Sequence, residues 1–177
     1  MPAADLLIVE DGTNVEDSNS YVTLTEFTAY CTLYAYQDVL DATEEAKVAA
    51  LVKACDLLET YSYRGIRTYE TQSLQFPRLD CVPRGAYLPI PLDKIPTALK
   101  RAQMAAAVSS AQGLDLQPVV QPGGFVTKEK VGPIETEYAD GIANGMTMPI
   151  FTAVDAMLAD YLQTGSNGRY AIRTLRV

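Results

Sequence analysis

The stretch TEEAKVAALVKACDLLETYSYRG, residues 43–65, decides the fold class. Thr43 can cap a helix, because a threonine oxygen accepts hydrogen bonds from the free N–H groups at a helix start. Two glutamates follow in the first turn, where the helix dipole favours acidic side chains. Apolar residues then recur at three- and four-residue steps. They form one stripe, made of Val48, Leu51, Cys55, Leu58 and Tyr61. We expect a helix that ends near Tyr63, before Gly65.

Three further segments have helical periodicity. The first begins at Thr23, which has capping-box spacing to Glu26. The second begins after Pro96 and stops near Gly113, and the third follows Pro149. The sequence therefore predicts four helices.

Two segments between these helices have strand character. Residues 64–95 contain several prolines, so we expect a long ordered loop or a pair of short strands there. Residues 125–138 predict a β-hairpin that turns at Gly132-Pro133. In that register two lysines face two glutamates, and such pairs help to fix strand pairing. The expected pairs are Lys128 with Glu137 and Lys130 with Glu135.

These patterns predict a mainly α fold. We expect a four-helix bundle core, a β-hairpin and long-loop excursion, and extended N- and C-terminal arms. The expected organisation is an N-terminal arm at 1–22, a helical domain at 23–163 with its hairpin at about 125–138, and a C-terminal docking arm at 164–177.

Enzymatic and metal chemistry are not indicated. The chain contains no histidine, which removes the commonest general base and the usual zinc ligand. Its cysteines, Cys31, Cys55 and Cys81, are widely spaced and odd in number, which favours neither a zinc site nor a disulfide framework. Cys31 and Cys55 lie within helical apolar patterns and are expected to act as small buried hydrophobes. We expect no catalytic residue, no metal and no cofactor. No apolar run reaches the ~18 residues that cross a membrane, and no signal peptide is recognisable. We therefore expect no membrane partner and synthesis in a cytoplasm.

The charge is unevenly distributed. The net charge is −8, yet residues 164–177 carry three arginines and no acid. A basic tail on an acidic body suggests an arm that docks on an acidic partner, and a solvated terminus is the alternative. An acidic body also repels nucleic-acid backbones.

One stretch, residues 61–87, interleaves aromatic and basic side chains. Stacking combined with phosphate contacts is how single-stranded nucleic acids are held without sequence preference. The residues expected at such an interface are Arg64, Arg67, Tyr69 and Arg78. The alternative, which the net charge of −8 favours, is that the arginines pair with acidic helices and the rings fill the core.

Seven short motifs follow one another along residues 18–163. They are NSYVTL (19–24), ALVKACDLLE (50–59), YRG (63–65), QFPR (75–78), IPTALKRA (95–102), EKVGPIETEY (129–138) and AVDAMLA (153–159). In this order they resemble the small head–tail connector, or adaptor, proteins of tailed bacteriophages and prophages. Part of that group is described as DnaT-like single-stranded-DNA-binding proteins. Phe76 is a departure, since a tryptophan is expected at this position in relatives.

The resemblance implies a non-enzymatic structural protein in the virion neck, made in the bacterial host cytoplasm. It implies a ring, commonly of twelve copies, bound to the portal protein and to a stopper or tail-completion protein. Genomic DNA would pass through the lumen without specific binding. The alternative is a DnaT-like single-stranded-DNA-binding protein.

The resemblance also directs attention to two sets of residues. In similar adaptors the C-terminal segment engages the portal. The corresponding residues here are Arg169, Tyr170, Ile172, Arg173, Leu175 and Arg176. The hairpin residues Lys128, Lys130, Glu135 and Glu137 are candidates for contacts between subunits.

Overall fold

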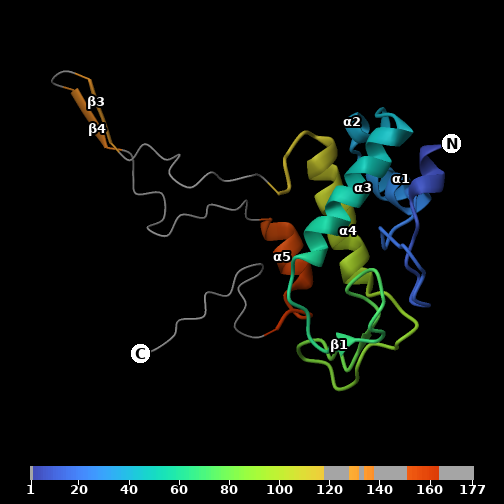
Figure 1. The fold of residues 1–177 in the computed structure, drawn as a ribbon. Coiled ribbons are helices and arrows are strands. Elements are labelled where there is room, and N and C mark those ends of the chain that lie inside the picture. Colours follow the sequence, from blue (N-terminus) through green and yellow to red (C-terminus); the bar gives the residue numbers. More distant parts are fainter. Residues whose placement is uncertain (1, 118–127, 132–133, 138–150, 164–177) are drawn as a thin grey trace, which may run out of the picture. The chain divides into compact units, whose positions relative to one another are not determined.

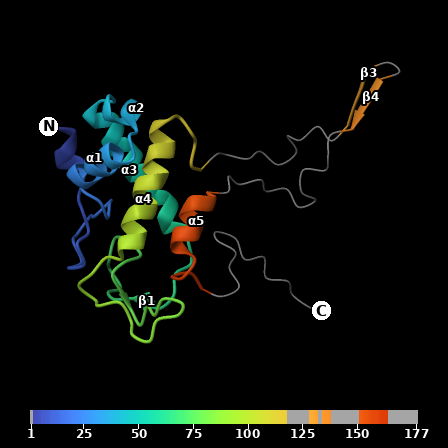
Figure 2. The same cartoon turned by 180° about the vertical axis from the view of Figure 1, so that it is seen from behind.

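The computed structural model describes residues 2–117, 128–131, 134–137 and 151–163 (Figure 1). The chain divides into two compact units. One comprises Met1–Leu116 with Phe151–Val177, and the other comprises Gln117–Ile150. Every described helix lies in the first unit, which Figures 1 and 2 show from opposite sides.

The described fold is mainly helical with a β-hairpin, which confirms the predicted fold class. The helices are η1 (Ala3–Leu6), α1 (Leu24–Leu33), α2 (Gln37–Leu40), α3 (Glu44–Glu59), α4 (Thr97–Ala111) and α5 (Thr152–Leu158). The strands are β1 (Ile66–Arg67), β2 (Arg78–Leu79), β3 (Lys128–Val131) and β4 (Ile134–Glu137). Sequence analysis missed α2, because four residues are too few to show a helical period.

Local capping explains where α1 and α3 begin. The Thr23 hydroxyl accepts a hydrogen bond from the Glu26 N–H (3.1 Å), and the Glu26 carboxylate accepts one from the Thr23 N–H (2.8 Å). This is the predicted capping box. At α3 the Thr43 hydroxyl accepts from the Ala46 N–H (3.3 Å), as the sequence also predicts.

Small residues form the contact between the two longest helices. α4 packs against α3 and also against α5. The buried alanines are Ala50 and Ala54 on α3, and Ala102, Ala106 and Ala107 on α4. Because interaxial distance depends on the side chains at the contact, alanines allow the two backbones to come close together.

Two helices end earlier than the periodicity predicts. α3 ends at Glu59 rather than near Tyr63, and α5 ends at Leu158 although its apolar stripe continues. The apolar residues beyond each end are still packed, because the two segments pair antiparallel with each other. The pairing consists of a bridge between Tyr63 and Leu162 and two hydrogen bonds, Arg64 N–H to Tyr161 O (2.8 Å) and Gln163 N–H to Ser62 O (3.0 Å).

Residues 2–22 lack an α-helix, but they fold against the helices instead of extending away as an arm. Tyr21 and Val22 are fully buried in the core. Glu10 is also buried, and its carboxylate organises the polar run that resembles a solvated arm in sequence. It accepts backbone N–H hydrogen bonds from Gly12 (2.8 Å), Asn14 (3.1 Å) and Val15 (2.8 Å). The polar run is therefore a loop closed around one satisfied carboxylate.

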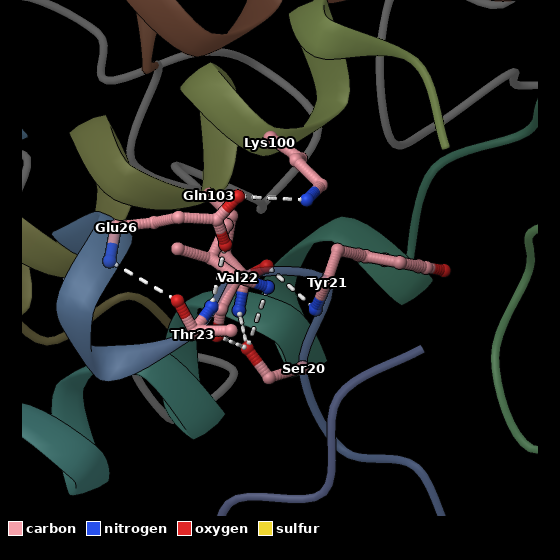
Figure 3. A network of polar contacts seen from close by, with 7 residues as sticks. All are labelled: Ser20, Tyr21, Val22, Thr23, Glu26, Lys100 and Gln103. Atoms are coloured by element: carbon pink, nitrogen blue, oxygen red, sulfur yellow. Dashed lines mark hydrogen bonds and ion pairs between the residues drawn. The ribbon is translucent and has the colours of Figure 1, made fainter. Parts of the chain in front are cut away.

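A buried glutamine on α4 joins the N-terminal segment to α3 (Figure 3). The Gln103 side chain is fully buried. Its Oε1 accepts from the Tyr21 N–H (2.9 Å), and its Nε2 donates to Ser20 Oγ (2.8 Å) and to Leu51 O (3.0 Å). One turn away, Lys100 Nζ forms an ion pair with Glu26 Oε1 (2.9 Å). A single helix face thus holds both the N-terminal segment and the start of α1.

The hairpin has the predicted register. β3 and β4 are antiparallel, with Lys128 opposite Glu137 and Lys130 opposite Glu135. The alternating charges in the sequence were therefore a sufficient signal for the strand pairing.

We predict that Gln103→Leu destabilises the fold by about 1–3 kcal/mol, which is the cost of leaving one buried polar group without a partner. The Tyr21 N–H loses its acceptor, whereas the Ser20 hydroxyl keeps its hydrogen bonds with the backbone of Val22 and Leu51 lies within helix α3. Urea unfolding followed by circular dichroism measures the change. Gln112→Leu is the matched control, since Gln112 is exposed at the end of the same helix. Equal stability of the two variants would contradict the prediction.

Candidate nucleic-acid interface

The aromatic and basic stretch 61–87 forms much of the loop that connects α3 with α4 (Figure 1). This loop contains the antiparallel pair β1–β2, in which Arg67 lies opposite Arg78. The structure separates the four predicted interface residues into two groups. Arg78 is buried and Arg64 half-buried, whereas Arg67 and Tyr69 are exposed.

Arg78 is a clamp within the loop. Its guanidinium donates hydrogen bonds to two parts of the loop, the segment 63–65 and residue Gln75. The acceptors are the carbonyl oxygens of Tyr63 (3.3 Å), Arg64 (2.8 Å), Gly65 (2.8 Å) and Gln75 (3.2 Å), and the side-chain oxygen of Gln75 (2.7 Å). The alternative interpretation expected this arginine to pair with an acidic helix. Its hydrogen bonds go to loop carbonyls and to the Gln75 side chain instead. A guanidinium engaged in this way cannot also bind a phosphate.

Arg64 fastens the loop to the segment that follows α5. Its Nε donates to Leu162 O (3.0 Å), and its Nη1 donates to Val82 O (3.3 Å). Gly65 follows with φ +71°, and a Cβ at that position would lie 2.3 Å from Leu79 O. Only glycine fits this close approach, which brings the Arg64 segment against β2.

The aromatic rings of the stretch mostly fill the core, as the alternative interpretation predicts. Tyr61, Tyr63 and Phe76 are buried. Tyr63 and Phe76 meet edge to face with ring centroids 5.1 Å apart, and Tyr21 meets Phe76 in the same way at 6.4 Å. The Tyr61 hydroxyl donates to Asp155 Oδ1 on α5 (2.5 Å). These three rings cannot stack on nucleic-acid bases without unfolding the loop.

A carboxylate at the end of α3 lies beneath the loop. The Tyr21 hydroxyl donates to Glu59 Oε1 (2.6 Å) and accepts from the Phe76 N–H (3.2 Å). Burial raises the pKa of Glu59 to about 7, although the Tyr21 hydrogen bond and the charges of Arg67 and Arg78 favour the ionised form. Burial and the nearby Glu59 charge together raise the pKa of Tyr21. Neither group was identified from the sequence.

The exposed remainder of the predicted interface is small. Arg67 and Tyr69 face solvent, and Tyr69 is 48% exposed. An open hollow of about 490 Å³ lies between this loop and the segment after α5, lined by Arg64, Gly65, Asp80, Val82 and Gln163. Because this lining contains one arginine and one aspartate, it has no excess positive charge to attract phosphates.

Two predicted sites remain, the hairpin and the C-terminal segment, and the structure describes only the first. Strand pairing places Lys128, Lys130, Glu135 and Glu137 on the hairpin, in a unit separate from the helices. The proposed portal-docking residues lie outside the described residues. They are Arg169, Tyr170, Ile172, Arg173, Leu175 and Arg176.

The described residues include all three cysteines, and each is buried with a free thiol. This confirms the predicted burial of Cys31 and Cys55. Within the described ranges no group of histidine, cysteine, aspartate or glutamate side chains could hold a metal ion. No helix in this part of the chain has both the length and the apolar character needed to cross a membrane.

Comparison with known proteins gives a family match over most of the chain. Residues 6–177 match the family described as "Putative DnaT-like ssDNA binding protein". The chain belongs to this family. No curated protein and no solved structure matches it.

The short motifs along the chain contact one another through these polar groups. Arg78 of the QFPR motif binds the carbonyls of the YRG motif. Tyr21 of NSYVTL binds Glu59, at the end of ALVKACDLLE. Asp155 of AVDAMLA accepts from Tyr61. The five motifs joined by these hydrogen bonds thus form an internal scaffold around the loop.

We predict that Glu59 makes stability depend on pH between about 4.5 and 7. The folded pKa, about 7, lies above the usual value of 4.5, so the protonated form stabilises the fold. This contribution is complete below pH 4.5 and is lost as the pH rises through 7, with a total of roughly 3 kcal/mol.

Urea unfolding across this pH range tests the prediction. Glu59→Gln should flatten the decline, since glutamine can still accept from Tyr21 but does not titrate. Glu45→Gln, at an exposed position in the first turn of α3, should retain the wild-type decline. The absence of histidine removes the usual competing source of pH dependence in this range. An unchanged decline in Glu59→Gln would refute the assignment.

Proposed function

We propose that this protein is a non-enzymatic head–tail connector of a tailed bacteriophage. In this proposal it forms a ring, commonly of twelve copies, in the virion neck. The ring binds the portal protein on one side and a stopper or tail-completion protein on the other, and genomic DNA passes through its lumen without specific binding. The protein is made in the bacterial host cytoplasm and needs no cofactor.

The internal use of the aromatic and basic stretch is the observation that carries this proposal. Arg78 is engaged by the loop that contains it, and Tyr61, Tyr63 and Phe76 are core residues. The larger part of a stretch that looks like a ligand surface in sequence thus has a structural role. The described residues of the helical unit, 2–116 and 151–163, carry eighteen acids and nine basic residues. An acidic wall lets DNA slide, because it offers no attraction to phosphates that would hold it.

Single-stranded-DNA binding is the second candidate function. The description of the family favours it. The exposed pair Arg67 and Tyr69 supplies one cation and one ring next to each other on the loop. One such pair is a small site, since base stacking contributes about 1–3 kcal/mol per base.

We predict that the C-terminal arm carries much of the affinity for the portal. Full-length chain should co-purify with the portal protein of its own phage, and removal of residues 165–177 should weaken binding at least roughly tenfold, because arms in a ring act multivalently. Exchange of the three tail arginines for glutamate should have the same effect, whereas Arg101→Glu on α4 should have none. Undiminished portal binding by the truncated chain would show that the arm is not the docking element.

We predict no more than weak binding to a fluorescent oligo-dT strand at low salt, measured by anisotropy. If the second candidate function is correct, binding is strong, depends on salt, and is lost in Arg67→Ala/Tyr69→Ala while Arg101→Ala retains it. The exposed pair is the appropriate target. Substitution of Arg64 or Arg78 would also disturb the fold, because both hold backbone carbonyls. Tight, salt-dependent binding would replace the connector proposal with the second candidate.

A further inference from the structure

A loop at one end of the helical unit holds apolar side chains in solvent. We call residues 82–89 the presenting loop. Three backbone hydrogen bonds hold it in place, so that it is ordered without being covered. The donor–acceptor pairs are Ile90 to Cys81 (3.0 Å), Ala86 to Pro83 (3.0 Å) and Arg84 to Asp160 (2.8 Å). The last of them ties the loop to the segment that follows α5.

The exposed side chains of the presenting loop are of the kinds that anchor protein interfaces. Tyr87 is 100% exposed and Leu88 77% exposed, and Arg84 is exposed beside them. Tyrosine and arginine are enriched among residues that dominate binding energy. The neighbouring strands add exposed Ile66 and Leu79. Several large apolar side chains kept out of the core in one loop region mark an interaction surface.

The opposite end of the same unit has the complementary charge. α3 spans the distance between the two ends, beginning beside α2 and η1 and ending at the loop that holds β1 (Figures 1 and 2). We call the first region the acidic end. Its exposed acids are Asp5, Asp38, Asp41, Glu44 and Glu45. Lys47 lies near them, half-buried, and its Nζ donates to Leu40 O (2.7 Å).

The acidic end also has an apolar surface. Leu33 is 80% exposed, and Tyr34 is exposed beside it. The Tyr34 ring lies 4.5 Å from that of Tyr30 and 6.2 Å from that of Tyr36, so the three rings form one cluster. By contrast, residues 61–95, which include the presenting loop, carry five basic residues and three acids. The two ends therefore differ in charge sign, and each has exposed aromatic and aliphatic groups.

We propose that the presenting loop of one copy of this chain docks on the acidic end of the next copy. Two acidic ends would repel each other, so the charges favour a head-to-tail contact between unlike surfaces. Contacts of that kind are heterologous, and they close into a ring when the rotation between subunits permits. The inference rests on the proposed ring and deepens it, because it names the two surfaces that join neighbouring subunits.

Complementation between two variants tests the proposal with the full-length chain. Arg84→Glu/Tyr87→Ala disables the presenting loop, and Asp38→Lys/Asp41→Lys disables the acidic end. Sedimentation velocity should show that the wild-type chain self-associates as its concentration rises, and that each variant alone does so at least roughly tenfold more weakly. An equimolar mixture should form dimers and stop there, because one intact loop then meets one intact acidic end. Lys53→Glu, at an exposed position midway along α3, makes the same charge change as Arg84→Glu and should behave as wild type.

Other outcomes would overturn the inference. A wild-type chain that stays monomeric at its highest soluble concentration, or variants that associate as well as wild type, would show that these surfaces do not join copies. A mixture that associates no better than its components would exclude the head-to-tail arrangement. Co-purification with the portal protein distinguishes a failure of the head-to-tail contact from a failure of the connector proposal. If both variants still co-purify with the portal protein and self-associate as well as wild type, the head-to-tail contact is wrong and the connector proposal stands. If the mixture forms dimers as expected but the wild-type chain does not bind the portal protein, the head-to-tail contact stands and the connector proposal is wrong.

Discussion

The buried side-chain amide of Gln103 links three segments that are distant in the sequence. It pairs with Tyr21 and Ser20 of the N-terminal segment (Figure 3) and with Leu51 of α3. Once Tyr21 is fixed, its ring meets Phe76 and its hydroxyl holds Glu59. The loop between α3 and α4 is thus supported from below by a residue that the N-terminal segment supplies. A polar core of this kind stabilises only when every member has a partner, and here the amide uses both its oxygen and its nitrogen.

This arrangement gives most of the aromatic and basic stretch a structural role in place of the nucleic-acid-binding role that its sequence suggests. Single-stranded nucleic acid is held by exposed rings and unengaged cations. In this protein the rings of Tyr63 and Phe76 pack against each other, and Arg78 donates hydrogen bonds to the backbone carbonyls of the loop that contains it. The outward-facing features are the presenting loop, which overlaps the end of the stretch, the exposed pair Arg67 and Tyr69, and the acidic end. Surfaces of that type suit a protein that binds other proteins.

Local rules determined how much of this could be predicted from the sequence. The cap at Thr23 and the hairpin register depend on residues a few positions apart, and both predictions are confirmed. The early end of α3 depends on pairing between segments about a hundred residues apart, which no local period encodes. The N-terminal arm was misread because a run of polar residues looks solvated whether or not Glu10 closes it. Gln103 did leave a signal, a single polar residue on the apolar face of α4 between Leu99 and Ala106.

The central claim is that this chain builds a layer of the phage neck. Electron microscopy of the portal protein mixed with the full-length chain measures this most directly. The account predicts one closed layer of chain copies beneath the portal, with neighbouring helical units in contact through unlike ends and an open channel along the axis. Portal particles that carry no such layer at saturating chain concentration would contradict it.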